Sequence, residues 1–107
     1  MENNQNNVEA HLTLAKLYFF QEDYQKALHS LDMILRAAEN RGVKKTVLLK
    51  ATIYCTLSLH YLEMDEDCQA FVNYIKRTSN IEEIRNLVKE EGLEQHWEII
   101  QKRLSPV

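Results

Sequence analysis

Apolar residues recur at steps of three and four along almost the whole chain, and short polar stretches divide them into runs. The first run starts at Val8 and reaches Phe20, where the polar residues 21–23 interrupt it. Positions three and four apart share one face of an α-helix, so this spacing predicts an amphipathic helix over about residues 8–20. Residues 1–7 are rich in asparagine and are expected to form a disordered tail.

The same periodicity predicts five further helices, divided by polar or glycine-containing breaks. Asp23 is placed to cap the second helix and Gly42 to end it. Ser79 and Glu82 have the spacing of a capping box, which predicts the start of the fifth helix. The third helix is apolar nearly all round, so neighbours are expected on two sides of it. The expected ranges are about 24–41, 44–62, 68–78, 80–91 and 93–104.

The composition places the chain in the all-α class. Of its 107 residues 2 are glycine and 1 is proline, and Pro106 lies beyond the last apolar run, so little interrupts a helix. The turn residues that a β-hairpin protein needs are missing. A hydrophobic fraction of 45% suits one folded domain, expected over residues 8–107. The expected fold is a single all-α domain of about six helices.

Charge and hydropathy limit the partners and the cellular location that are expected for the protein. A net charge of −3 argues against nucleic acid as a direct partner, because such domains carry a basic face. No apolar run reaches the ~20 residues that span a bilayer, and the polar start has no signal-peptide core. Cys55 and Cys68 lack the paired spacing of a metal site and are expected to be buried free thiols. A reducing, cytoplasmic location without membrane contact is expected.

The chain also repeats itself at an offset of 43 positions. Matched positions agree in size or aromatic character and keep the same place relative to an acidic break. The unit is a helix, a tight polar turn and a second helix, which is the spacing of an antiparallel helical hairpin. The matched pairs are His11 with Tyr54, Leu14 with Leu57, Ala15 with Ser58, Tyr18 with Tyr61, Ala27 with Ala70, and Leu31 with Tyr74.

These residues resemble the tetratricopeptide repeat, a family of stacked helical hairpins. The family pattern is a bulky residue, Leu, a small residue and Tyr, then an acidic turn, Tyr, Ala and a bulky residue. The second copy departs from it at Asp67, where the turn tyrosine belongs. The period exceeds the family's common value of about 34 and is similar to that of sensor regions in large bacterial transcription activators. The first copy has His11, Leu14, Ala15, Tyr18, Asp23, Tyr24, Ala27 and Leu31, and the second has Tyr54, Leu57, Ser58, Tyr61, Glu66, Asp67, Ala70 and Tyr74.

The resemblance implies an α-solenoid with repeat one over about 8–42, repeat two over about 44–78 and capping helices over about 79–104. It implies that Ala15 and Ala27 let two helices approach closely, while Tyr18 and Tyr24 fill the space beside them. It further implies a ligand-binding concave face lined by the first helix of each repeat. The matching groove residues are Glu9, Leu12, Lys16, Phe19, Phe20, Thr52, Cys55, Leu59, Leu62 and Glu63.

This expected groove is mostly apolar, which suits an amphipathic helix, with Lys16 and Glu9 setting its orientation. A carboxylate-binding site of the kind that some family members use is not expected, because Lys16 has no asparagine partner. The alternative is that the fifth or sixth helix folds back into the groove and fills it. The groove residues would then belong to the core.

No motif for catalysis or for a cofactor is present. A GxSxG sequence, a glycine-rich phosphate loop and a Cys/His nucleophile arrangement are all missing, so the chain is not expected to be an enzyme. The four histidines do not have metal-binding spacings, and the acidic residues 63–67 lack the glycine and regular alternation of a calcium loop. Neither a metal nor a cofactor is expected.

The sequence therefore predicts a non-catalytic protein–protein interaction module, a scaffold or an adaptor, that binds a helix or peptide of another protein. A second copy of the chain is a further candidate partner. The alternative function is a sensor or oligomerisation segment of a larger bacterial transcriptional or signalling regulator. The two hypotheses differ in whether the segment transmits a signal to another domain.

Overall fold

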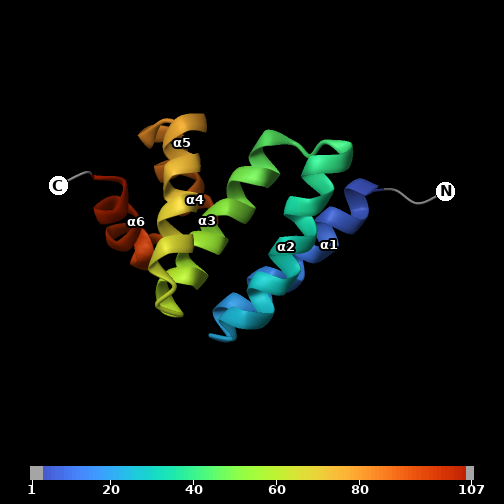
Figure 1. Ribbon diagram of the computed structural model, residues 1–107, viewed down its shortest axis with the longest axis horizontal. Helices are drawn as coiled ribbons and strands as arrows, with labels where there is room; N and C mark the ends of the chain where they lie inside the picture. Colours follow the sequence, from blue (N-terminus) through green and yellow to red (C-terminus); the bar gives the residue numbers. More distant parts are fainter. Residues whose placement is uncertain (1–3, 106–107) are drawn as a thin grey trace.

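A computed structural model describes residues 4–105, and within this range all regular structure is helical (Figure 1). This confirms the expected all-α class with six α-helices. A short 3₁₀-helix, η1, follows α5. The bounds are α1 (Asn4–Phe20), α2 (Tyr24–Arg41), α3 (Lys45–Tyr61), α4 (Asp65–Thr78), α5 (Ile81–Glu90), η1 (Glu94–His96) and α6 (Trp97–Leu104).

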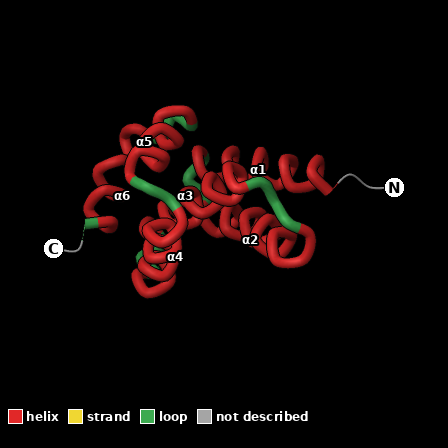
Figure 2. Tube along the Cα trace, turned by 90° about the horizontal axis from the view of Figure 1, so that it is seen from above, coloured by secondary structure: helices red, strands yellow, loops and turns green. Residues whose placement is uncertain are grey.

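Three turns of identical hydrogen-bond pattern connect α1 to α2, α3 to α4, and α5 to η1 and α6. The first two helix pairs pack closely as hairpins. Helices α5, η1 and α6, which pack less closely on one another, are together called the C-terminal hairpin. The short connections are visible in Figure 2. In each turn one residue has positive φ: Glu22 at 64°, Glu63 at 60° and Gly92 at 72°. The next amide donates to a carbonyl five residues earlier, which is the Schellman ending of a helix. These bonds join Asp23 N to Tyr18 O, Met64 N to Leu59 O, and Leu93 N to Val88 O, each at 2.9 Å.

The turns show that the first two hairpins repeat at 41 positions, from Glu22 to Glu63, and not at the expected 43. A shift of two residues turns a side chain by about 200° around a helix axis, so it moves positions from one face to the other. Ala27 is fully buried and its true counterpart is Cys68, also fully buried, whereas Ala70 is exposed. The pairing of Ala27 with Ala70 is therefore wrong.

The same shift of two positions changes which residues correspond in the first helices of the two hairpins. Leu57 is fully buried but Leu14 is 43% exposed, so the two do not share one packing role. Ala15 is fully buried and corresponds to Thr56, whose carbonyl accepts a hydrogen bond from the Cys68 thiol at 3.3 Å. Small side chains thus meet at both crossings, but Thr56 and Cys68 fill the places that the expected pattern gave to Ser58 and Ala70.

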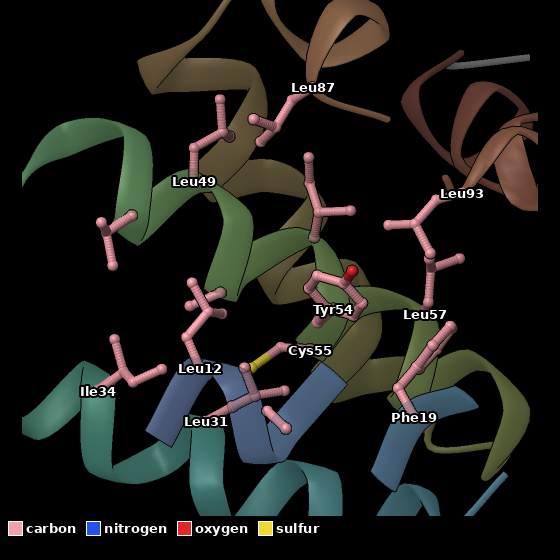
Figure 3. Packing of buried hydrophobic residues seen from close by; sticks show 14 of the residues in the cluster. Leu12, Phe19, Leu31, Ile34, Leu49, Tyr54, Cys55, Leu57, Leu87 and Leu93 are labelled. Atoms are coloured by element: carbon pink, nitrogen blue, oxygen red, sulfur yellow. The ribbon is translucent and has the colours of Figure 1, made fainter. Parts of the chain in front are cut away.

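Helix α3 lies at the centre of the fold, as its apolar content predicts. All residues from 51 to 59 are buried, and α3 contacts α1, α2, α4 and α6. Side chains from α1, α2 and the C-terminal segment point toward it in Figure 3, where Leu12, Leu31 and Leu93 are labelled. The core is therefore built around one helix that has no solvent-exposed face along its middle.

Most expected boundaries are close to the observed ones, but the start of α1 and the capping box of α5 differ. Helix α1 begins at Asn4, so residues 4–7 are helical where a tail was expected; residues 1–3 and 106–107 lie outside the described range. The capping box is formed by Asn80 and Glu83, one position after the expected Ser79 and Glu82. Asn80 caps the helix because its amide oxygen accepts a hydrogen bond from the Glu83 N–H at 2.9 Å.

The register of 41 predicts opposite results for two alanine substitutions. Ala27→Leu adds three carbon atoms at a fully buried position and is expected to lower the free energy of unfolding by about 1–3 kcal/mol. Ala70→Leu, at an exposed position, is expected to change it by less than about 0.5 kcal/mol. Urea unfolding followed by circular dichroism measures both. Equal losses would contradict the corrected register.

Backbone strain at the turns predicts opposite results for a second pair of substitutions. Glu63→Gly is expected to stabilise the fold by about 0.5–1 kcal/mol, because glycine adopts a φ of 60° without the cost that a side chain brings. Gly92→Ala is expected to destabilise the fold by about 1 kcal/mol, because alanine adopts the φ of 72° only with backbone strain. A methyl group there meets no atom within 4 Å, so no steric clash adds to this cost.

The control for this pair is Gln101→Gly, at an exposed position inside α6 with ordinary helical backbone. It is expected to cost about 1 kcal/mol, as glycine does within a helix. Thermal unfolding of the three variants checks the signs. A loss of stability in Glu63→Gly would show that the turn does not store the strain inferred from its φ.

Candidate functional site

The expected groove is not open in the structure. Leu12, Phe19, Cys55 and Leu59 are exposed by only 7, 2, 2 and 4%, so they are core residues. Phe19 packs edge-on against Tyr54, with ring centres 5.3 Å apart. The expectation that Leu12 and Phe19 line an accessible binding surface is wrong. Cys55 and Leu59 are also buried, but they lie at the bottom of a groove on another side of α3, between α2 and α4. Among the other residues of the expected groove, Glu9, Phe20 and Glu63 are exposed. Lys16 and Leu62 are partly buried, and Thr52 is buried.

The C-terminal hairpin fills the place of the groove, which is the alternative that the sequence left open. Glu91, in the turn after α5, lies between α1 and α3. One of its carboxylate oxygens accepts a hydrogen bond from the Tyr54 hydroxyl at 3.0 Å and lies 2.8 Å from Lys16 Nζ. The other lies 3.5 Å from Lys50 Nζ. Lys16 therefore binds a carboxylate, but one supplied by its own chain.

The surroundings of Glu91 set its charge state. Burial raises the pKa of its carboxyl, but the hydrogen bonds from Lys16 and Tyr54 and the two lysine charges outweigh this, so the net pKa is lowered. Its side chain is only 9% exposed. The ionised carboxylate thus fastens the C-terminal hairpin to α1 and α3, and its role is structural.

A cluster of aromatic rings and histidines continues this contact. The Tyr24 and Tyr61 rings are stacked 5.0 Å apart, and the Tyr61 hydroxyl is hydrogen-bonded to His96 Nδ1 at 2.7 Å. Phe19 touches the same imidazole edge-on at 5.3 Å. Burial lowers the pKa of His96. The neutral imidazole therefore serves as a packing and hydrogen-bonding group, and Tyr24, expected to support the first hairpin, also joins that hairpin to the next one.

The last helix is joined to the second hairpin by a further polar contact. Arg103 Nη2 donates to Asp65 Oδ1 at 2.9 Å, and Arg103 Nε donates to His60 Nδ1 at 3.2 Å. Burial, together with the Arg103 charge, lowers the pKa of His60. These groups connect α6 to the α3–α4 turn, so they are used within the fold.

The chemistry of the described residues gives no sign of a reactive site. Cys55 and Cys68 are both free and buried, and burial followed by the charge of Asp32 raises the pKa of the Cys55 thiol to about 12. A thiol this hard to ionise is a poor nucleophile. Within residues 4–105, no three His, Cys, Asp or Glu side chains gather into a metal-binding group. In the same range, no helix combines the length and the apolar character needed to cross a membrane.

An open apolar surface lies instead on the outer side of the first hairpin. A depression of about 490 Å³ runs between α1 and α2, on the side of α2 away from α3. Leu14 and Met33 line it, each 43% exposed, and the neighbouring Leu17 is 53% exposed. We call this the α1–α2 face. Its lining residues are His11, Leu14, Tyr18, Gln25, Lys26, His29, Ser30 and Met33.

Sequence reasoning missed this surface because it assigned Leu14 to the interior of the hairpin. The available signal was the pair Leu14 and Leu17, which lies on the opposite side of α1 from Leu12 and Phe19. A helix with apolar residues on two faces has two neighbours or one neighbour and one open apolar face.

Comparisons of the chain with protein-family models, with curated proteins and with solved structures found no match.

Removing the Glu91 charge is expected to destabilise the fold in a pH-dependent way. Glu91→Gln keeps an acceptor for Tyr54 but leaves Lys16 and Lys50 without their carboxylate, at a cost of about 1–3 kcal/mol near neutral pH. A carboxyl group with a lowered folded-state pKa stabilises the fold fully above its unfolded-state pKa. That contribution is lost as the pH falls through the lower folded-state value.

Urea unfolding of both proteins between about pH 7 and pH 3 measures this difference. The two free energies of unfolding are expected to converge at the acid end. Glu90→Gln, at an exposed neighbouring position, is the control and is expected to follow the parent chain throughout. A constant difference at every pH would mean that the Glu91 charge does not contribute to stability.

Proposed function

We propose that the protein is a non-catalytic protein–protein interaction module and that it binds a helix of another protein on the α1–α2 face. The observation that carries this proposal is the concentration of exposed apolar side chains on one hairpin. Of the six large hydrophobic residues exposed within residues 4–105, four belong to α1 or α2. They are Leu14, Leu17, Phe20 and Met33. Apolar patches of this kind mark interaction sites more often than scattered single residues do.

The shape of the surface favours a helix as the bound element. The depression lies between two antiparallel helices of 17 and 18 residues, and its lining residues lie about one turn apart on each helix. Such a furrow accepts the apolar stripe of an amphipathic helix, with side chains at steps of three and four. Met33 and Leu14 are suited to this role, since flexible side chains can adapt to the occupant.

The charged residues that line the depression indicate which charge the partner helix carries. The lining includes Lys26, His11 and His29 but no aspartate or glutamate. Lys26 lies 3.6 Å from Asp23 and 5.7 Å from the centre of the Tyr18 ring, an exposed arrangement that a partner carboxylate can share. The proposed partner helix therefore carries acidic residues beside its apolar stripe.

The position of the hairpin in the array supports the same function. In a stack of hairpins, a terminal unit stays soluble when its outer side is polar. The first hairpin packs on α3 with one side, but its outer side is apolar. This proposal includes the resemblance to tetratricopeptide repeats and action as a scaffold or adaptor in the cytoplasm. Three successive helix–turn–helix units and two free thiols agree with it.

The test uses a fluorescent 18-residue peptide (about five helical turns) with a leucine stripe flanked by glutamates. The chain is expected to bind it, and Leu14→Glu with Met33→Glu is expected to weaken binding about tenfold or more, through loss of apolar contact and repulsion of the peptide. Fluorescence anisotropy measures the affinity. Because both positions are exposed, the melting temperature should change little.

Thr13→Glu, an exposed change on the same helix outside the depression, is the control and should leave binding unchanged. Phe19→Glu places a charge in the core and is expected to unfold the protein. Equal affinity for the parent and the double variant would refute the α1–α2 face as the site. Light scattering completes the test: a dimer that dissociates in the double variant would make a second copy of the chain the occupant.

A further inference from the structure

A second groove lies on the other side of α2, between α2 and α4. Two adjoining depressions of about 380 and 270 Å³ share Leu35 of α2 and Phe71 of α4, so they form one continuous groove. Its floor is α3. We call it the α2–α4 groove; its lining residues are Leu28, Asp32, Leu35, Ala38, Glu39, Leu48, Thr52, Cys55, Leu59, Asp67, Ala70, Phe71 and Tyr74.

The groove exists because small residues stand where its walls would otherwise meet. Ala38 on α2 and Ala70 on α4 are the shortest side chains of the walls, while Leu35, Phe71 and Tyr74 are only partly buried. The C-terminal hairpin covers the side of α3 that carries Lys50 and Tyr54, and no residue of α5, η1 or α6 lines this groove. An apolar channel about 16 Å long, the rise of α2 from Leu28 to Glu39, is thus open to a partner.

The charged residues that line the groove are all acidic. Asp32 and Glu39 lie on the α2 wall and Asp67 on the α4 wall, and the lining includes no lysine, arginine or histidine. Asp32 accepts a hydrogen bond from Arg36 Nε at 2.8 Å, but the Arg36 side chain is 73% exposed and this pair is within one helix. An exposed pair of that kind contributes little to the stability of the fold.

The spacing of these carboxylates specifies the occupant. Asp32 and Glu39 are seven residues apart, which is two helical turns or about 10 Å along α2. A helix lying in the groove would meet them with basic residues that are likewise seven apart. Asp67, which lines the same end of the groove as Asp32, would meet a third basic residue on the other flank.

We propose that the α2–α4 groove binds an amphipathic helix of another protein, with an apolar stripe flanked on both sides by lysine or arginine. This surface is separate from the α1–α2 face, and the partner has the opposite charge. The apolar stripe supplies most of the affinity, whereas the rim carboxylates select the sign of the charge and set the register of the helix.

The experiment uses two fluorescent 18-residue peptides with the same leucine stripe, about five helical turns long. One carries arginines on both flanks, with two of them seven residues apart, and the other carries glutamates at the same positions. Because the glutamate peptide is also the probe of the α1–α2 face, the two peptides are compared on a Leu14→Gln with Met33→Gln variant, which removes the apolar lining of that face without adding charge. On this variant we expect the arginine peptide to bind at least about tenfold more tightly, and its affinity to fall as salt is added. Similar affinities of the two peptides for this variant would overturn the proposal.

Variants of the chain locate the binding. Glu39→Lys with Asp67→Lys is expected to weaken arginine-peptide binding about tenfold or more. Glu90→Lys with Glu94→Lys changes the net charge equally at exposed positions outside the groove and should leave the affinity within about threefold. If both double variants weaken binding equally, the peptide responds to overall charge and the proposal fails.

A third variant tests the channel itself. Ala70→Trp, at an exposed position, should fill the groove and prevent binding while leaving the melting temperature nearly unchanged. Leu14→Glu with Met33→Glu should leave arginine-peptide binding intact, since those residues line the other surface. Binding that survives Ala70→Trp, or that is lost in the Leu14 and Met33 variant, would place the peptide elsewhere and overturn the proposal. Neither result would affect the test of the α1–α2 face.

Discussion

The burial of α3 on every side is the constraint on which the rest of the structure depends. A helix whose residues 51–59 are all buried needs covering elements around its whole circumference. Helices α1, α2 and α4 cover part of it, and two hairpins alone leave the side of Tyr54 and Lys50 open. The C-terminal hairpin closes that side, with the Glu91 carboxylate between Lys16 and Lys50. The place that a concave groove would occupy is therefore part of the core, and the open apolar depressions lie on the outer sides of the fold.

Helix α2 separates the two surfaces that remain. One side of it forms the α1–α2 face with basic lining residues, and the other forms the α2–α4 groove with acidic ones. Under the two proposals, this arrangement would let one small domain distinguish two helices by charge, since like charges placed opposite each other disfavour the wrong partner. A module with two surfaces of opposite preference suits a scaffold or adaptor, which joins proteins that do not otherwise meet.

The polar groups of the interior show that the surroundings of a residue determine its role. Lys16, Glu91, Tyr61 and His96 are the residue types from which binding sites are built, yet each is paired inside the fold. Their hydrogen bonds satisfy groups that would be costly to bury alone. They fix where the last hairpin lies, whereas apolar contacts of Leu87, Leu93 and Ile100 supply most of the burial there.

The sequence by itself determined the all-α class, the six helices and most of their ends, because these follow from local periodicity and from caps such as Asp23 and Gly42. It also determined that α3 would have neighbours on more than one side, because its apolar residues lie nearly all round the helix. The tertiary structure alone decided the register of the hairpins, since Ala70 and Cys68 differ by only two positions but lie on opposite sides of α4. It likewise decided that the last hairpin fills the groove. Both outcomes depend on contacts between residues far apart in the chain, such as Lys16 with Glu91, and the hydrophobic pattern within one helix does not specify which neighbour will cover it.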